Sequence, residues 1–87
     1  MYILLVNLDD IYYNLYLKNN ETQELILLFS FDRENYIAQL CDYIVEHNIT
    51  TLYLTGTDDY MQRKILATLP EYCVAVYDYK IRIEVLK

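Results

Sequence analysis

The spacing of apolar and polar residues predicts three strands in the first part of the chain. Residues 2–6 (YILLV) are almost continuously apolar, as in a strand covered on both faces. Residues 11–17 (IYYNLYL) alternate between two faces, and residues 23–31 (QELILLFSF) form a third apolar run. The polar segment 18–22 (KNNET) has the Asn residues that favour tight turns. An antiparallel meander is therefore expected.

The apolar spacing changes to three and four over residues 32–47, which predicts a helix. Its apolar stripe consists of Tyr36, Ile37, Leu40, Cys41, Ile44 and Val45. We expect Asp32 to cap the first turn and Asn48 to end the helix in a left-handed conformation. Asp42 and Glu46 lie four residues apart on a different face, and no basic residue is near enough in the helix to pair with either.

Residues 49–56 (ITTLYLTG) are rich in β-branched and aromatic residues and end at the single Gly, which predicts a central strand. Thr57 or Asp58 is expected to cap a short second helix that ends at Pro70. The TGTDDY segment lacks the further glycines and the Lys of a phosphate-binding loop, so capping explains it better.

The last two predicted elements are strands. Residues 72–79 (YCVAVYDY) are predicted to form a buried strand, and residues 80–87 (KIRIEVLK) alternate as an edge strand does. The expected order is β-β-β-α-β-α-β-β, which defines an α/β (α+β) fold with one mixed sheet. At 87 residues, the chain has room for one hydrophobic core, so residues 1–87 are expected to form a single domain.

The first strand and its turn, residues 5–17 (LVNLDDIYYNLYL), and this element order resemble the ribonuclease H-like fold of Holliday-junction resolvases. In those enzymes the first strand ends in an Asp that binds magnesium. That position falls here on Asn7, or on Asp9 if the alignment slides by two residues. An amide is a neutral ligand and does not replace a carboxylate in a two-metal site. The family's last acidic ligand also lies on a helix beyond the strands predicted here, so the resemblance implies the fold without a working nuclease.

Two pairs of adjacent aspartates support an alternative hypothesis, in which the chain is a relative of metal-dependent nucleases. If the first and fourth strands are parallel neighbours, as in ribonuclease H, Asp9 and Asp10 lie near Asp58 and Asp59 at one edge of the sheet. Four carboxylates there would hold a divalent cation. Turn formation and helix capping explain the same residues without a metal, and we expect no cofactor. The single histidine, His47, is expected to stabilise a helix C-terminus.

Cysteine usage and hydropathy set the expected environment. The two cysteines, Cys41 and Cys73, lie in apolar runs without a CxxC pairing, so we expect small buried side chains and neither a zinc site nor a disulfide scaffold. A basic segment followed by an apolar one is absent at the N-terminus, and the apolar runs are too short to span a membrane. These features predict a cytoplasmic protein.

The charge is uneven, because residues 1–48 hold eight acidic and two basic residues and residues 49–87 hold five of each. Negative potential repels phosphate backbones and attracts basic proteins. We therefore expect no direct nucleic-acid binding and a basic protein or nucleoprotein partner. The chain also has eleven tyrosines, and exposed tyrosines beside acids are typical of binding surfaces. The expected partner-binding residues are Asp9, Asp10, Glu21, Glu24, Asp42, Tyr43 and Glu46.

These features predict a small acidic, non-enzymatic binding module. In size and charge it is similar to phage-encoded inhibitors, including anti-CRISPR proteins, which can occupy nucleic-acid grooves by carrying phosphate-like charge. A third hypothesis is a structural subunit that forms a homodimer through the strand at residues 80–87, since an unpaired strand can extend a sheet across two chains.

Overall fold

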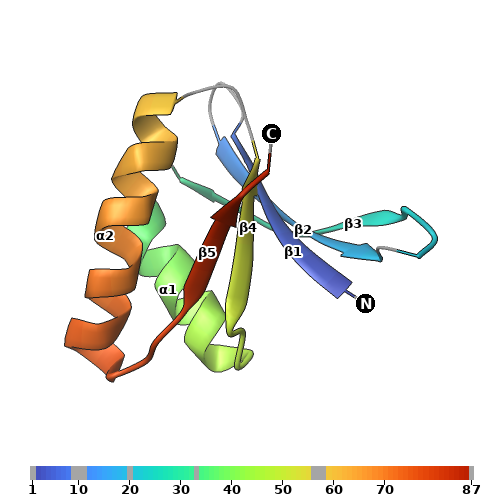
Figure 1. The fold of residues 1–87 in the computed structure, drawn as a ribbon. Coiled ribbons are helices and arrows are strands. Elements are labelled where there is room, and N and C mark those ends of the chain that lie inside the picture. The colour runs from blue at the N-terminus through green and yellow to red at the C-terminus, as the bar shows by residue number, and fades with distance from the viewer. Residues whose placement is uncertain (1, 9–11, 20, 33, 56–58, 87) are drawn as a thin grey trace.

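Five strands and two helices follow one another in the order β-β-β-α-β-α-β (Figure 1). The computed structural model describes residues 2–8, 12–19, 21–32, 34–55 and 59–86. The elements are β1 (Tyr2–Leu8), β2 (Tyr12–Asn19), β3 (Leu25–Asp32), α1 (Tyr36–Glu46), β4 (Thr51–Thr55), α2 (Asp59–Tyr77) and β5 (Arg82–Val85).

The strands form one mixed sheet in the order β3-β2-β1-β4-β5. The first three strands are antiparallel neighbours, so the predicted meander is confirmed. The strands β1, β4 and β5 are parallel to one another, and Val6 of β1 pairs with Leu54 of β4. The first and fourth strands are therefore parallel neighbours, the arrangement on which the four-carboxylate hypothesis depends. The fold class, a single α+β domain with a mixed sheet, is confirmed as well.

Both helices lie on the same face of the sheet (Figure 1). The chain moves in one direction across the sheet from β3 through α1 to β4 and from β4 through α2 to β5. Right-handed crossovers in one direction place their helices on one face. The opposite face carries no helix of the described chain, and its side chains include Asn7, Tyr16 and Tyr53.

The hydrophobic core lies between the sheet and the helices. Its fully buried side chains come from four strands and both helices, and they include Val6, Tyr13, Leu15, Phe31, Leu40, Ile44, Leu52, Leu54, Ile65 and Leu69. Cys41 and Cys73 are fully buried in the same cluster, as predicted. Three aromatic rings meet within it, because Tyr13 packs against Phe31 and Tyr36 with ring centroids 5.4 and 4.8 Å apart.

The predicted buried strand at residues 72–79 is wrong, and so is the predicted helix end at Pro70. The helix α2 continues through Pro70 to Tyr77. The spacing of buried residues explains why the helix continues. Ile65, Leu69 and Cys73 are fully buried at intervals of four residues, as on one face of a helix, and the residues after Cys73 are exposed through Tyr77. Strand propensity of this valine- and tyrosine-rich segment is overridden by the packing of one helical face.

The structure confirms the predicted end of α1 and contradicts its predicted start. Asn48 follows α1 with a φ of 55°, as expected for a left-handed helix stop, and the Ile49 amide donates to the Ile44 carbonyl at 3.0 Å. Asp32 does not cap α1, because β3 continues through Asp32, which pairs with Tyr12. The cap position is Asn35, and no side chain caps it. The expected cap of α2, Thr57 or Asp58, lies outside the described residues.

Candidate protein-binding surface

The most unusual exposed feature of the described chain is the first half of β3, LILL. Leu25, Ile26 and Leu27 are 56, 53 and 53% exposed, and Leu28 is 38% exposed. Successive strand residues point to opposite faces, so both faces of this segment are open. Figure 1 shows why, since the β2–β3 hairpin extends away from the helices. Exposed apolar side chains that follow one another in this way are typical of interaction sites.

The strand β3 is also an edge of the sheet, because β2 is its only neighbour among the strands that the structure describes. One side of its backbone is therefore available for pairing with another strand. A bulge interrupts the pairing with β2, since Leu15 pairs with Phe29 and Tyr16 with Leu27, which leaves Leu28 as the extra residue. The apolar segment is thus presented on an edge that the fold itself does not cover.

Local hydrogen bonds stabilise the turn between β2 and β3. The Asn19 amide donates to the Glu24 carbonyl at 3.0 Å, and the Asn19 side-chain oxygen accepts the Glu21 amide at 2.9 Å. Gln23 adopts a left-handed conformation with a φ of 63°. The predicted tight turn therefore exists, and it places two exposed acids, Glu21 and Glu24, directly before the apolar segment.

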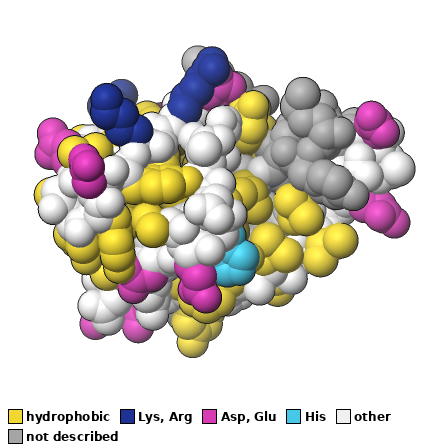
Figure 2. Space-filling view, turned by 90° about the horizontal axis from the view of Figure 1, so that it is seen from below, with side chains coloured by type: hydrophobic (Ala, Val, Ile, Leu, Met, Phe, Trp, Pro, Cys, Tyr) yellow, Lys and Arg dark blue, Asp and Glu magenta, His cyan; other side chains and the backbone are white. Residues whose placement is uncertain are grey.

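The predicted partner-binding acids lie in two groups rather than one. Glu21 and Glu24 lie at the hairpin, whereas Asp42 and Glu46 are exposed on α1. In Figure 2, acidic side chains lie at the hairpin end, at the right in both views, and hydrophobic side chains gather next to them. Asp9 and Asp10 lie outside the described residues. In the structure, the hairpin acids therefore lie next to an apolar surface, and the sequence analysis did not predict this.

Two of the predicted binding residues on α1, Asp42 and Tyr43, have contacts within the fold. The Tyr77 hydroxyl donates to the Asp42 carboxylate, and Glu46 forms no ion pair with any described residue. Tyr43 is half-buried and stacks between Phe29 and His47, with ring centroids 5.7 and 4.1 Å apart. His47 Nδ1 lies 3.0 Å from the Tyr43 carbonyl oxygen, which supports the structural role predicted for it at the end of α1.

The structure does not test whether the four acids considered as metal ligands come together, because three of them lie outside the described residues. These three are Asp9, Asp10 and Asp58, and Asp59 is an exposed residue at the start of α2. Among residues 2–8, 12–19, 21–32, 34–55 and 59–86, no group of three or more His, Cys, Asp or Glu could hold a metal ion.

Asn7, one of the two residues that the sequence resemblance aligns with the resolvase Asp, is part of a polar row on the face without helices. It pairs with Asn14 on β2 and Thr55 on β4, and Asn14 in turn pairs with Ser30 on β3. The Ser30 hydroxyl donates to the Asn14 side-chain oxygen at 2.8 Å. Neutral amides and hydroxyls line this row, which is suited to hydrogen bonding rather than to holding a divalent cation.

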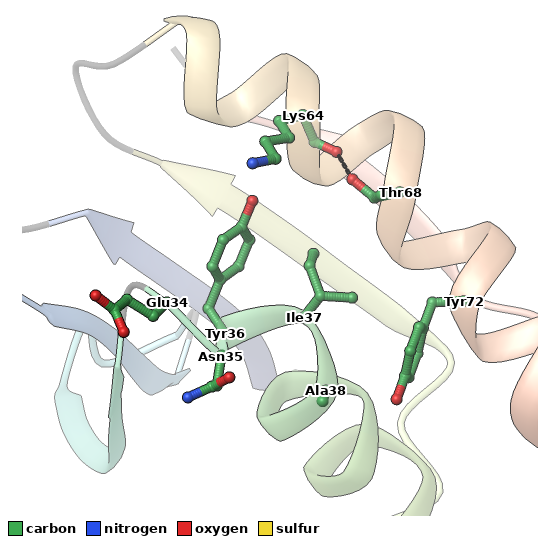
Figure 3. A pocket seen from close by; sticks show the side chains of 8 residues that line it. All are labelled: Glu34, Asn35, Tyr36, Ile37, Ala38, Lys64, Thr68 and Tyr72. Carbon is green, nitrogen blue, oxygen red and sulfur yellow. Dashed lines mark hydrogen bonds between the residues drawn. The ribbon is translucent and has the colours of Figure 1, made fainter.

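A cleft of about 320 Å³ lies between the first turn of α1 and α2 (Figure 3). Its lining residues are Glu34, Asn35, Tyr36, Ile37, Ala38, Lys64, Thr68 and Tyr72. The charged lining residues are Glu34, just before α1, and Lys64, in the N-terminal half of α2. The Thr68 hydroxyl donates to the Lys64 carbonyl.

Tyr36 is the one lining residue of this cleft with an unusual environment. Its hydroxyl is buried without a hydrogen-bond partner among the described residues, and burial is the main reason that its pKa is raised above 10.0. The hydroxyl points toward α2 in Figure 3. A buried hydroxyl without a hydrogen-bond partner lowers the stability of the fold.

The fold and the exposed surface define the class of this chain, which is a small α+β domain with an open apolar edge strand. Comparisons with known proteins do not define it further. No protein-family model matches the chain, and no curated protein matches it. Neither helix of the described chain is long and apolar enough to span a membrane.

Proposed function

We propose that this protein is a small acidic binding module, without catalysis of its own, that docks on a basic, nucleic-acid-binding protein partner. The observation that carries the proposal is the β3 edge, where Leu25, Ile26 and Leu27 are more than half exposed next to Glu21 and Glu24. An apolar surface beside acids fits a partner segment that combines apolar and basic side chains.

The mode of docking that fits β3 is strand addition. An extended partner segment would pair with the free edge of β3 as a sixth strand, and its main chain would satisfy the edge amides and carbonyls. Burial of the leucine and isoleucine side chains would supply most of the affinity, because each fully buried aliphatic side chain contributes about 1.5–3 kcal/mol. The acids would mainly raise the association rate and select basic partners.

The wider biological setting belongs to the same proposal. In size and in its net charge of -6, the chain is similar to phage-encoded inhibitors such as anti-CRISPR proteins. We propose that it acts in the cytoplasm and inhibits its partner by occupying a groove that would otherwise receive nucleic acid. Direct nucleic-acid binding is not part of the proposal, since the negative charge opposes it.

The binding test uses candidate basic nuclease complexes and two sets of variants. Glu21→Gln with Glu24→Gln should slow association at low salt and reduce the salt dependence of binding. Leu25→Asn with Leu27→Asn should weaken binding about tenfold or more at every salt concentration, because apolar contact is lost. Glu71→Gln and Leu66→Asn on α2 are the matched controls, since both residues are exposed and lie away from β3. Equal affinity of both β3 variants and their controls would refute docking through β3.

A relation to the ribonuclease H-like fold is a second part of the proposal, and the sheet supports it. The meander is followed by an α-β-α-β segment, and β1 and β4 are parallel neighbours, as in the ribonuclease H-like architecture. The alternative that follows is a metal-dependent nuclease relative, because β1 and β4 end at the same edge of the sheet, just before the two doubled acids. Titration with magnesium and manganese in the presence of a branched DNA substrate tests it, with Asp59→Asn as the variant. Cleavage that requires the cation and is lost in Asp59→Asn would favour the nuclease over the binding module.

Self-association through the strand at residues 80–87 is the third proposal, and it is supported by the place of β5 at the other edge of the sheet. Two features oppose it. The strand β5 has four residues, and Arg82 forms an ion pair with Glu84 on it. Charged side chains on a short edge strand protect against pairing. Light scattering at high protein concentration decides the point, because a monomer would exclude this dimer.

A further inference from the structure

The two cysteines of the chain face one another across the interface between the helices. Cys41 on α1 and Cys73 on α2 have Sγ atoms 2.9 Å apart, and either thiol can donate the hydrogen bond between them. Both side chains are fully buried, and both thiols are free. The two residues are 32 positions apart in the chain, so only the packing of α1 against α2 brings them together.

We infer that Cys41 and Cys73 are a site of intramolecular disulfide formation that links α1 to α2 when the protein meets a small-molecule disulfide oxidant. A disulfide bond is about 2.0 Å long, so the sulfur atoms need to approach by only about 0.9 Å. A second contact joins α1 to α2 near the cysteines. Tyr77, which lies four residues after Cys73, donates a hydrogen bond to Asp42, which directly follows Cys41.

The reaction balances with a glutathione-type disulfide as the oxidant. One cysteine thiolate attacks a sulfur of the oxidant, which forms a mixed disulfide and releases one thiolate. The second cysteine then attacks the protein sulfur of the mixed disulfide and releases the other. The protein loses two protons and two electrons, and the oxidant becomes two thiol molecules. Either cysteine can be the first nucleophile, because either thiol can donate the hydrogen bond between them and leave the other sulfur as the acceptor.

Burial controls how fast this site reacts. It is the main cause that raises the pKa of Cys41 to about 12 and the pKa of Cys73 above its ordinary value. Neither thiol is therefore ionised to a useful extent in the closed structure at neutral pH, and the oxidant cannot reach either sulfur without separation of the helices. The same packing excludes reductants once the bond has formed, so the disulfide forms slowly and persists.

The test is the thiol–disulfide equilibrium of the full chain with reduced and oxidised glutathione, measured in buffer and in concentrated urea. The intramolecular disulfide is quantified by the loss of two hydrogens in the intact mass and by resistance to alkylation. If the folded structure holds the sulfurs ready to bond, its formation constant should be about tenfold higher or more in buffer than in urea. Equal or lower values in buffer would overturn the inference, because the fold would then oppose the bond.

Two single variants are the matched controls. Cys41→Ala and Cys73→Ala each retain one thiol, so they can accept one glutathione but cannot lose two hydrogens. If wild-type protein in buffer gives only glutathione adducts or disulfide-linked dimers, the inference is wrong. The measurement does not involve β3 or a partner, so its result is independent of the proposed binding function.

Discussion

The Tyr77 hydroxyl near the end of α2 donates a hydrogen bond to the Asp42 carboxylate on α1. This hydrogen bond is the main cause that raises the pKa of Tyr77 from 10.0 to about 12. One of the acids that the sequence suggested for partner binding thus has a contact within the fold. The contact lies beside the two cysteines, and both contacts join α1 to α2.

The first prediction concerns the pH dependence of this contact. A phenol whose pKa is raised in the folded state contributes stability below pH 10, the ordinary value, and the contribution is lost as the pH rises toward 12. The stability difference between wild type and Tyr77→Phe should therefore be constant up to about pH 10 and shrink above it. Urea unfolding at a series of pH values measures this difference. A difference that grows with pH would contradict the assigned hydrogen bond.

The second prediction is that Tyr36→Phe stabilises the protein. The Tyr36 hydroxyl is buried with no hydrogen-bond partner among the described residues, and an unsatisfied buried hydroxyl costs about 1–3 kcal/mol. The ring itself packs against Tyr13 and remains in the variant. Chemical denaturation should show a higher unfolding free energy by about 1 kcal/mol. Loss of stability would mean that the hydroxyl has a bonding partner in solution.

A comparison of two leucines tests which part of the sheet is core. Leu52 on β4 is fully buried, so Leu52→Ala should lower the unfolding free energy by about 2–5 kcal/mol. Leu27 on β3 is 53% exposed, so Leu27→Ala should lower it by about 1 kcal/mol or less. Both values come from urea unfolding of the isolated protein. A large loss in Leu27→Ala would contradict the exposure of the β3 edge.

Local patterns were sufficient to predict most elements. The meander, the helix that contains Cys41 and its stop at Asn48 follow from residue spacing and from the left-handed tolerance of Asn. The run from Leu25 to Leu28 was correctly identified as strand, but its exposure was not foreseen. Exposure depends on the order of strands in the sheet and on where the helices end, and both are set by contacts between distant residues.

Residues 72–79 show the opposite failure, in which a local pattern misled. Valines and tyrosines around Cys73 favour a strand, and Pro70 favours a helix end. Packing of Ile65, Leu69 and Cys73 against the core on one helical face outweighs both. The candidate site was only partly predictable for the same reason. Glu21 and Glu24 were identified, whereas the apolar edge beside them depends on the assembled sheet.

The last prediction uses Pro70 to test this helix directly. Proline has no amide hydrogen to donate to the carbonyl four residues earlier, and its ring crowds that carbonyl. If α2 runs without a break from Asp59 to Tyr77, Pro70→Ala restores one helical hydrogen bond. We expect an increase of about 1–3 kcal/mol in unfolding free energy and an unchanged or slightly higher helix signal in circular dichroism.

Glu71→Ala is the control for this substitution, because it changes a neighbouring exposed residue of α2 without changing the backbone hydrogen bonds. Its stability should stay within about 0.5 kcal/mol of wild type. If residues 72–79 formed a strand after a helix end at Pro70, alanine there would favour the wrong conformation and lower the stability. The sign of the Pro70→Ala effect therefore distinguishes the continuous helix from the strand that the local sequence suggests.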